Sequence, residues 1–149
     1  PWFNFVKMVL AKGELLILHI PDLKVDYIYK NKLTYVPLGN DRYWVGATYD
    51  WKFNNDEVTE KGKKILLKKI NQDLEIPFTI EHHQAAIRPT IKDRRPVLGL
   101  HAQHSQLAIF NGLGTKGASL APYFATMLSA RLIRNIPVGR SVRVKRFLK

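Results

Sequence analysis

Short apolar runs separated by turn residues dominate the first third of the chain. Residues 15–20 form one such run between a glycine and a proline, and a run of this length favours a buried strand over a helix. Three β-rich segments follow at residues 27–29, 32–36 and 43–48, with turn-forming residues between them. Together these segments predict an antiparallel meander.

The middle of the chain changes to a helical period. Thr59 is suited to cap a helix, and after it the apolar residues Ile65, Leu66 and Ile70 recur at near-helical spacing. Lysines fall on the opposite side of the same turns. This pattern predicts an amphipathic helix that ends before Pro77.

Extended segments return after the predicted helix. Residues 78–80 and 85–87 predict a long strand that runs back across the sheet and stops at Pro89, because a residue before proline favours extended backbone and a proline lacks the N–H of a strand. Residues 106–111 are another strand candidate. They run directly into a glycine-rich segment over residues 112–117.

A second helix is predicted over Ser119 to Arg134, where large apolar residues recur every four positions. Pro122 is tolerable in it because the first turn of a helix needs no N–H donor there. No internal repeat, low-complexity tract or long linker is present. The order of elements predicts an α+β fold with one sheet-rich lobe and one strand-turn-helix unit.

The composition is that of a folded domain. With 149 residues, of which 46% are hydrophobic, the chain has enough apolar content to bury a core. No apolar run approaches the roughly 18 to 20 residues needed to cross a bilayer, and the opening residues do not resemble a signal sequence. The sequence starts without Met inside an apolar run, from which we expect that an upstream part is missing.

Missing residue types and motifs exclude several kinds of chemistry. The absence of Cys rules out disulfides, thiolate zinc sites, iron–sulfur clusters and a cysteine nucleophile, and it agrees with the cytoplasmic location that we expect. No Gly-x-Ser-x-Gly elbow for a hydrolase is present, and the scattered acids offer no carboxylate pair for glycoside chemistry. We assign no catalytic residue from these patterns.

Histidines do not form a convincing metal site either. His101 and His104 have an i, i+3 spacing but no carboxylate accompanies them. The adjacent His82 and His83 would point to opposite faces of a strand and could not share an ion. We therefore expect no bound metal.

The charge is strongly basic, with 24 Lys and Arg against 12 Asp and Glu, for a formal net charge of +12. One interpretation is a nucleic-acid-binding module, because such charge favours polyanions. The other is a solvated lysine face. The basic residues cluster at Lys61–Lys64 with Lys68 and Lys69, and again at Arg140–Lys149, not in one stripe with aromatic residues between, which favours the solvated face.

The segment from Ala86 to Gly99 contains the first candidate for chemistry. Arg88 stands at the end of the predicted strand, before Pro89, and a rigidly held guanidinium suits bidentate capture of a carboxylate. The alternative is a structural ion pair with Asp93 or Glu81.

The second candidate is the strand-to-helix turn with Gly112, Gly114 and Gly117. Without side chains, such a turn lets backbone N–H groups approach an anionic or carbonyl oxygen at a helix N-terminus. The alternative is a tight turn into a packed helix. It is not the dinucleotide-binding fingerprint, which needs a βαβ unit and an acidic residue about 20 residues downstream.

An ordered set of short motifs over residues 11–133 resembles the FAD-dependent oxidoreductases of the D-amino-acid oxidase and glycine oxidase family. The order is more specific than any single piece. The segments that carry the resemblance are Lys12-Gly13-Glu14, Tyr35-Val36-Pro37, Val45-Gly46-Ala47-Thr48, Arg88-Pro89 with Asp93, Pro96 and Gly99, the turn from Gly112 to Gly117, and Leu120-Ala121-Pro122.

The resemblance implies a role for each candidate. Arg88 is expected to bind the carboxylate of an amino-acid substrate. The segment lying against the flavin, with backbone hydrogen bonds near its pyrimidine edge, is expected to comprise Leu113, Gly114, Thr115, Lys116, Gly117, Ala118 and Ser119. A helix dipole there would stabilise the negative charge that hydride transfer leaves on the flavin.

The resemblance also implies a division of the chain and an activity. Residues 1–97 are expected to form mostly a substrate-binding lobe with a mixed, largely antiparallel sheet, and residues 98–149 the closing strand-turn-helix of an FAD-binding domain. The family's N-terminal dinucleotide-binding segment is absent from these residues and is expected as a partner. The implied function is oxidation of the C–N bond of an amino acid or amine by hydride transfer to FAD, and the alternatives are a basic nucleic-acid-binding module or a noncatalytic relative.

Overall fold

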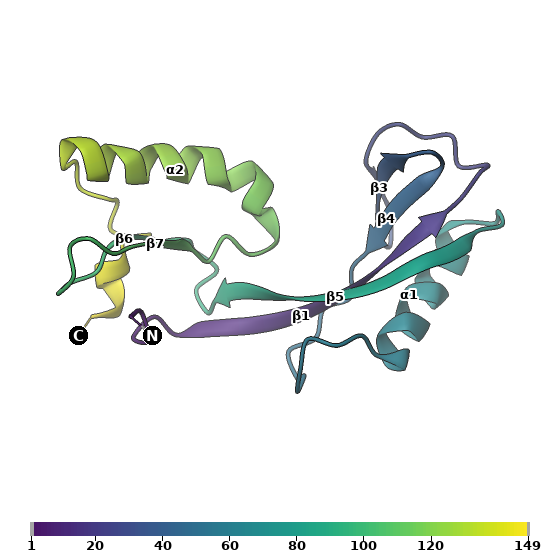
Figure 1. The fold of residues 1–149 in the computed structure, drawn as a ribbon, viewed down its shortest axis with the longest axis horizontal. Helices are drawn as coiled ribbons and strands as arrows, with labels where there is room; N and C mark the ends of the chain where they lie inside the picture. The colour runs from purple at the N-terminus through teal and green to yellow at the C-terminus, as the bar shows by residue number, and fades with distance from the viewer. Residues whose placement is uncertain (1, 149) are drawn as a thin grey trace. The chain divides into compact units, whose positions relative to one another are not determined.

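The predicted meander is present in the computed structural model, which describes residues 2–148. Strands β2 (Tyr29–Lys30), β3 (Thr34–Gly39) and β4 (Arg42–Gly46) pair antiparallel in turn, and β4 pairs antiparallel with β1 (Met8–His19) (Figure 1). Strand β5 (Thr79–Ile91) lies at the other side of β1, so that the sheet order is β2-β3-β4-β1-β5. The fold is α+β with a mostly antiparallel sheet.

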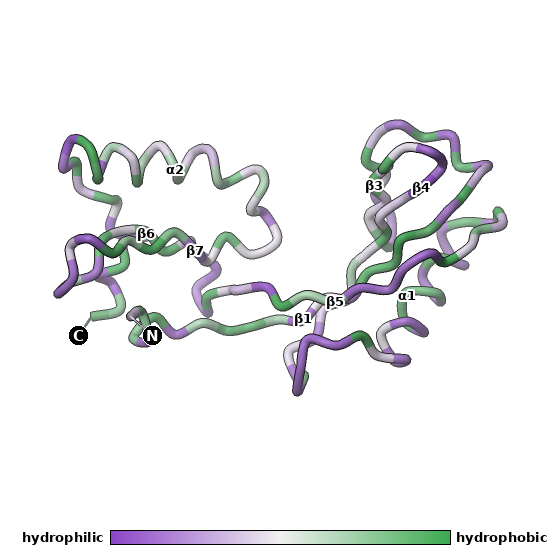
Figure 2. The backbone as a smooth tube through the Cα atoms, viewed as in Figure 1, coloured by the Kyte–Doolittle hydropathy of each residue, from purple (hydrophilic) through white to green (hydrophobic). Residues whose placement is uncertain are grey.

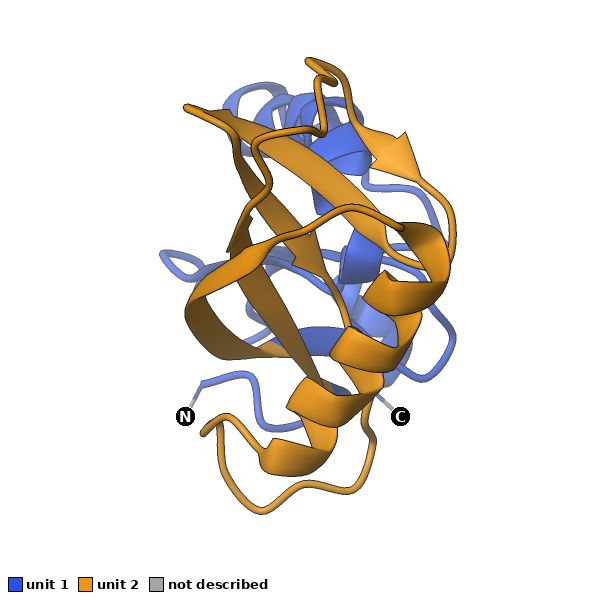
Figure 3. Cartoon of the chain, turned by 90° about the vertical axis from the view of Figure 1, so that its right-hand side faces the viewer, with its two compact units in different colours: residues 1–10, 88–149 blue, residues 11–87 orange. Residues whose placement is uncertain are grey.

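The chain divides into two compact units (Figure 3). One unit is Ala11–Ile87, which contains most of the five-stranded sheet and helix α1 (Glu60–Asp73). The other unit joins residues 1–10 to residues 88–149. We call them the sheet unit and the C-terminal unit.

The core of the sheet unit forms between one face of the sheet and α1. Leu16, Leu18 and Ile20 alternate along β1 and its end, so their side chains lie on one face, where they meet Leu66 and Ile70 of the helix. Figure 2 shows hydrophobic stretches along β1 and alternating colours around α1. All five side chains are fully buried, whereas Ile65, which we expected in the apolar stripe, is 39% exposed.

Helix α1 begins where the sequence predicted. Thr59 has extended backbone angles, and its hydroxyl accepts the Gly62 N–H at 2.9 Å, which satisfies one of the N–H groups that the first turn leaves without a partner. The Thr59 hydroxyl in turn donates to Glu14 Oε1 at 2.8 Å. The cap is therefore tied to the middle of β1.

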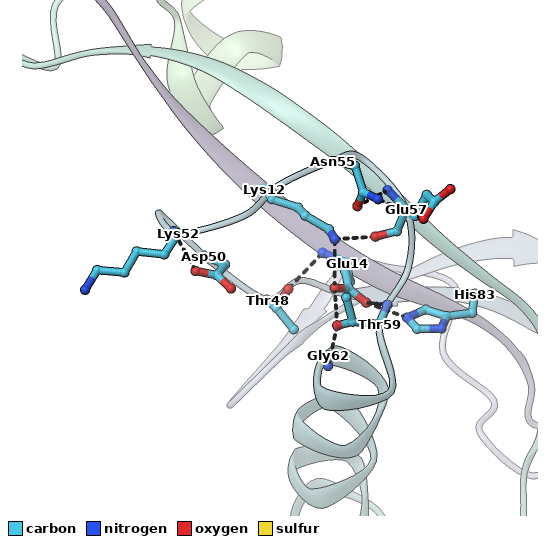
Figure 4. Close-up of polar contacts among 10 residues, drawn as sticks. All are labelled: Lys12, Glu14, Thr48, Asp50, Lys52, Asn55, Glu57, Thr59, Gly62 and His83. Carbon is cyan, nitrogen blue, oxygen red and sulfur yellow. Dashed lines mark hydrogen bonds and ion pairs between the residues drawn. The ribbon is translucent and has the colours of Figure 1, made fainter.

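Glu14 is the centre of a buried polar cluster in the sheet unit (Figure 4). One carboxylate oxygen also accepts the Thr59 N–H at 2.9 Å, Lys12 Nζ lies 3.5 Å from the carboxylate, and His83 Nε2 of β5 lies 2.9 Å from it. Lys12 in addition donates to the backbone carbonyl of Glu57. The cluster joins β1, β5 and the loop before α1.

The environment of Glu14 favours its ionised form. Burial raises the pKa of the carboxyl group, but the hydrogen bonds from the Thr59 amide and hydroxyl, together with the nearby Lys12 and His83, outweigh burial and lower the pKa of Glu14 below its ordinary value of 4.5. The lowered pKa means that Glu14 stabilises the fold fully above its unfolded-state pKa. That contribution is lost as the pH falls through the folded-state pKa.

The C-terminal unit contains a two-stranded antiparallel sheet of β6 (Val97–Leu100) and β7 (Ala108–Asn111), followed by a short 3₁₀ turn, η1 (Gly114–Lys116). Helix α2 (Gly117–Arg134) comes next, and a second 3₁₀ turn, η2 (Val144–Phe147), lies near the end of the chain. The strand-turn-helix order agrees with the sequence prediction.

Residues 142–147 are built into this unit and are not an extended basic tail. Val144 is buried in a core cluster with Val6, Ile91, Val97 and Ile109. The Leu98 N–H of β6 donates to the Val142 carbonyl at 2.9 Å. The end of the chain therefore supports β6 directly.

One expectation about the second half of the chain is wrong. Strand β5 does not stop before Pro89 but continues through it to Ile91. Since β5 is an edge strand of the sheet, a proline can be accommodated there without breaking a ladder on both sides.

The second predicted helix is present as α2, which begins two residues earlier than the sequence predicted. Within the part of the chain that the structure describes, no side chain of α2 is buried, and Ile133 is 82% and Tyr123 66% exposed. The repeat identifies the apolar side of the helix, but it does not tell which part of the protein packs against that side. Over residues 2–148, no helix is long and apolar enough to span a membrane.

We predict that Glu14→Gln lowers the free energy of unfolding by about 2–3 kcal/mol at pH 7, because an amide group would face the Thr59 donors and the Lys12 ammonium. The difference from the wild type should shrink as the pH falls from the ordinary Glu pKa of 4.5 through the lower folded-state pKa, at which Glu14 of the folded wild type becomes protonated. Urea unfolding between pH 3 and 8 measures it. Asp56→Asn, at an exposed position of the preceding loop, is the control, and a difference that does not depend on pH would contradict the prediction.

Candidate functional site

Arg88 lies near the end of β5, in the C-terminal unit, and is half-buried. The two acids that the sequence offered as its partners each hold another arginine. Glu81 Oε2 is 2.7 Å from Arg42 Nε, and Asp93 Oδ2 is 3.2 Å from Arg146 Nε. Each of these acids therefore already has a cationic partner.

The two residues after Pro89 anchor the end of β5. The side chain of Thr90 is buried, and its hydroxyl donates to the Val9 carbonyl of β1. Ile91 is buried in the core of the C-terminal unit. The backbone that carries Arg88 is thus fixed from its C-terminal side.

The glycine turn has the conformation that its residue types allow. Gly112 has φ +74° and Gly114 φ +59°, in the left-handed region that residues with a side chain rarely adopt. The Gly112 N–H donates to Asn111 Oδ1 at 2.8 Å. This turn leads from β7 through η1 into α2.

The glycine turn packs directly against the end of β5. A Cβ atom at Gly112 would lie 2.6 Å from Ile91 Cδ1, and one at Gly114 would lie 3.8 Å from Thr90 Cγ2. Only glycine at position 112 permits this approach. The structure therefore brings the turn against β5 at the residues two and three positions beyond Arg88.

The start of α2 offers hydrogen-bond donors rather than a finished cap. No side chain caps this end, and its first turn contains no acidic residue. The first N–H groups of a helix have no acceptor within the helix, and they favour an electron-rich group at the helix N-terminus. Positions 114–116, 118 and 119 are exposed, as such a contact requires.

This donor set fits one edge of a flavin. The pyrimidine edge of the ring presents carbonyl oxygens and a nitrogen, which accept hydrogen bonds from backbone amides, and glycines leave room for a planar ring to approach. The segment from Leu113 to Ser119 would hold that edge. These residues contain no further glycine-rich turn that could bind the pyrophosphate of the cofactor.

Two of the five histidines, His101 and His104, lie in the C-terminal unit, where they meet in the connection between β6 and β7. His101 Nδ1 accepts the Gln103 and His104 N–H groups at 3.2 Å each, and His101 Nε2 lies 2.8 Å from the Trp2 carbonyl oxygen. Among the residues that the structure describes, no group of three or more His, Cys, Asp or Glu side chains could hold a metal ion. The role of His101 is to shape the β6–β7 connection.

Sequence reasoning missed Arg146, which stands among the clustered basic residues at the end of the chain. Its guanidinium binds Asp93 and the Arg95 and Pro96 carbonyls, in the turn between β5 and β6. No local signal marks this residue. The pairing joins positions more than 45 residues apart, which only the folded structure brings together.

The chain matches the family model for FAD dependent oxidoreductase over residues 1–131. It belongs to this family. The match covers the sheet unit and most of the C-terminal unit, and it includes every segment that carried the sequence resemblance. FAD is the cofactor of the family, in agreement with our expectation from the motifs.

Known proteins of similar sequence and structure agree with the family. Glycine oxidase of Bacillus subtilis (strain 168) is 29% identical over 138 residues, which are 87% of this chain and 36% of that protein. The crystal structure of iminodiacetate oxidase from Chelativorans sp. BNC1 has a TM-score of 0.73 at 25% identity and covers 91% of this chain and 39% of its own.

A further crystal structure has the same fold at lower identity. Glycine oxidase from Bacillus cereus ATCC 14579 gives a TM-score of 0.73 at 17% identity, over 92% of this chain and 39% of its own. The chain therefore spans less than two fifths of the length of these three proteins.

We predict that Gly112→Ala destabilises the C-terminal unit by about 2–3 kcal/mol, because alanine is strained at positive φ and its Cβ would displace Ile91. The matched control is Gly117→Ala. Gly117 is helical, with φ −53°, and the nearest atom to an added Cβ is 3.8 Å away. It should be neutral or stabilising by up to about 1 kcal/mol. Chemical denaturation of both variants measures this, and equal effects would contradict the prediction.

Proposed function

We propose that this chain supplies the substrate-facing strands and the closing flavin contact of an oxidoreductase that oxidises the C–N bond of an amino acid or amine. The observation that carries the proposal is the packing of the glycine turn against β5 directly after Arg88. Neighbouring segments of one unit then supply a cation that can bind the substrate and backbone N–H groups that can donate hydrogen bonds to the cofactor. The family match over residues 1–131 supports the same conclusion.

Arg88 is the proposed substrate-binding residue. A guanidinium is always charged and presents a planar fork of donors, which matches the two oxygens of a carboxylate. Burial of the neighbouring Thr90 and Ile91 restricts the backbone at this position and so reduces the entropy that Arg88 would lose on binding. Its role is to orient the substrate so that the Cα–H faces the redox centre.

The segment 113–119 is the proposed flavin contact. Bound FAD supplies the two-electron acceptor for the hydride. The contribution of the chain is a set of backbone N–H groups at the N-terminus of α2, where the helix dipole and the hydrogen bonds stabilise negative charge on the pyrimidine edge. Because a hydride mechanism asks the protein mainly to orient the substrate, the lack of an assigned general base is consistent with it.

The proposed partner is a dinucleotide-binding segment that lies upstream in the same protein. In this proposal residues 1–97 form mostly the substrate-binding lobe, and residues 98–149 complete the FAD-binding domain. The apolar residues of α2 support this, since Tyr123, Leu132 and Ile133 are all more than half exposed in the described chain and would be covered by the partner. The two-stranded sheet of β6 and β7 is also short for a domain core and could be extended.

The proposal is tested with the chain joined to the coding sequence immediately upstream of Pro1. The purified protein should be yellow, with the absorption bands of bound FAD, and amino acids or amines should bleach those bands under anaerobic conditions. A colourless protein that takes up no FAD, or a flavoprotein that no amine or amino acid reduces, would contradict the proposal.

For this flavoprotein we predict that Arg88→Ala raises the KM for a carboxylate-bearing substrate by two orders of magnitude or more. The reason is the loss of a charged, bidentate contact, which contributes about 3 kcal/mol to substrate binding. Arg88→Lys should rescue it only partly, because an ammonium cannot form the fork. Steady-state kinetics measures both. The matched control is Arg140→Ala, an exposed arginine of the same unit, and unchanged KM in Arg88→Ala would remove Arg88 from the site.

A further inference from the structure

Arg146 makes a set of contacts that a surface arginine does not need. Its side chain is only 15% exposed. Nη1 donates to the Pro96 carbonyl at 2.9 Å, Nη2 donates to the Arg95 carbonyl at 3.1 Å, and Nε pairs with Asp93 Oδ2 at 3.2 Å. The guanidinium carbon lies 4.4 Å from the centre of the Phe147 ring. All these acceptors belong to one turn, residues 91–96.

We propose that Arg146 is a positioning residue that holds this turn, and through it the glycine turn, in place against β5. The expected effect of Arg146 on substrate and FAD binding rests on the proposed function, since it concerns the same site. Arg146 lies outside the matched residues 1–131, so nothing in the family match assigns it a role.

The contacts form a continuous path to the glycine turn. The Arg95 carbonyl oxygen, which accepts from Arg146, lies 3.4 Å from the position of a Cβ at Gly112. The side chain of Ile91, at the start of the same turn, is the other close neighbour of Gly112. If the turn shifts, the surface on which Gly112 rests shifts with it.

The turn needs an external support because its own backbone is strained and it contains one acid that a guanidinium can bind. Arg94 has φ +56°, a conformation that costs a residue with a side chain free energy, and its N–H donates to the Ile91 carbonyl at 2.8 Å. Lys92, Arg94 and Arg95 surround a single acid, Asp93. Asp93 Oδ1 accepts the Arg95 N–H at 3.1 Å, and Asp93 Oδ2 pairs with Arg146, so the acid links the turn to η2.

A planar guanidinium suits this task and an ammonium does not. Three nitrogen atoms of Arg146 serve three acceptors at different places along the turn. A lysine has its three donors at one point and could reach only part of the set. Arg146→Lys should therefore retain part of the effect, and Arg146→Gln almost none.

The first test is amide hydrogen exchange, which needs no activity. In Arg146→Gln, exchange at Arg94, Arg95 and Gly112 should become about tenfold faster, with Arg146→Lys in between, since opening of the turn is no longer opposed by charged hydrogen bonds. Amides in β4 of the sheet unit should not change. Arg140→Gln removes the same charge from an exposed position and is the control.

The second test is binding and kinetics in the flavoprotein that includes the upstream segment. Arg146→Gln should raise both the dissociation constant of FAD and the KM for the amino acid about tenfold while changing kcat less than about threefold, because the placement of donors and not the chemical step is altered. Asp93→Asn, which keeps the two carbonyl contacts, should give the same changes at smaller size. It serves as the second variant if Arg146→Gln does not fold.

The outcomes separate this inference from the proposed function. Unchanged exchange in Arg146→Gln overturns the positioning role, as does faster exchange with unchanged FAD affinity and KM. A wild-type protein that oxidises no amine or amino acid refutes the proposed function instead. In that case the exchange and FAD-affinity measurements still decide whether Arg146 positions the turn.

Discussion

The contact between a glycine turn and the end of an edge strand is the constraint on which the rest of the C-terminal unit depends. Gly112 can approach Ile91 because it has no side chain and because it tolerates a positive φ. Through this contact the N-terminus of α2 is placed close to the strand that carries Arg88. Two features that are ordinary when taken separately thereby become parts of one candidate site.

The two units hold their parts by different means. In the sheet unit, the buried carboxylate of Glu14 binds the cap of α1, a lysine and a histidine. One ionised group thus links β1, β5 and the start of α1. In the C-terminal unit, a mostly buried guanidinium, Arg146, binds the turn after β5. In both cases one charged group satisfies several acceptors or donors, which is what makes burial of a charge tolerable.

Local patterns in the sequence predicted the features that depend on local physics. The cap at Thr59 follows from the hydrogen bonds of a helix terminus, and the meander of β2, β3 and β4 follows from residue type and turn position. The prediction that β5 stops at Pro89 was wrong because the effect of a proline depends on whether its strand lies at an edge. That is a property of the whole sheet.

Features that depend on long-range contacts could not be predicted in this way. Nothing near Arg146 in the sequence indicates that it binds residues 93–96, and nothing in α2 indicates that its apolar side lacks cover within this chain. The roles proposed for Arg88 and for residues 113–119 came from the order of motifs along the chain. The structure adds that the glycine turn meets β5 just beyond Arg88.

The most direct test is a crystal structure of the FAD-bound protein, including the proposed upstream segment, with an amino acid or a carboxylate inhibitor. We expect the Arg88 guanidinium within about 2.7–2.9 Å of the ligand carboxylate, as in charge-assisted pairs, and amides of residues 113–119 at hydrogen-bond distance from the flavin pyrimidine edge. A carboxylate held by other residues, or a flavin ring that does not reach the N-terminus of α2, would contradict the account.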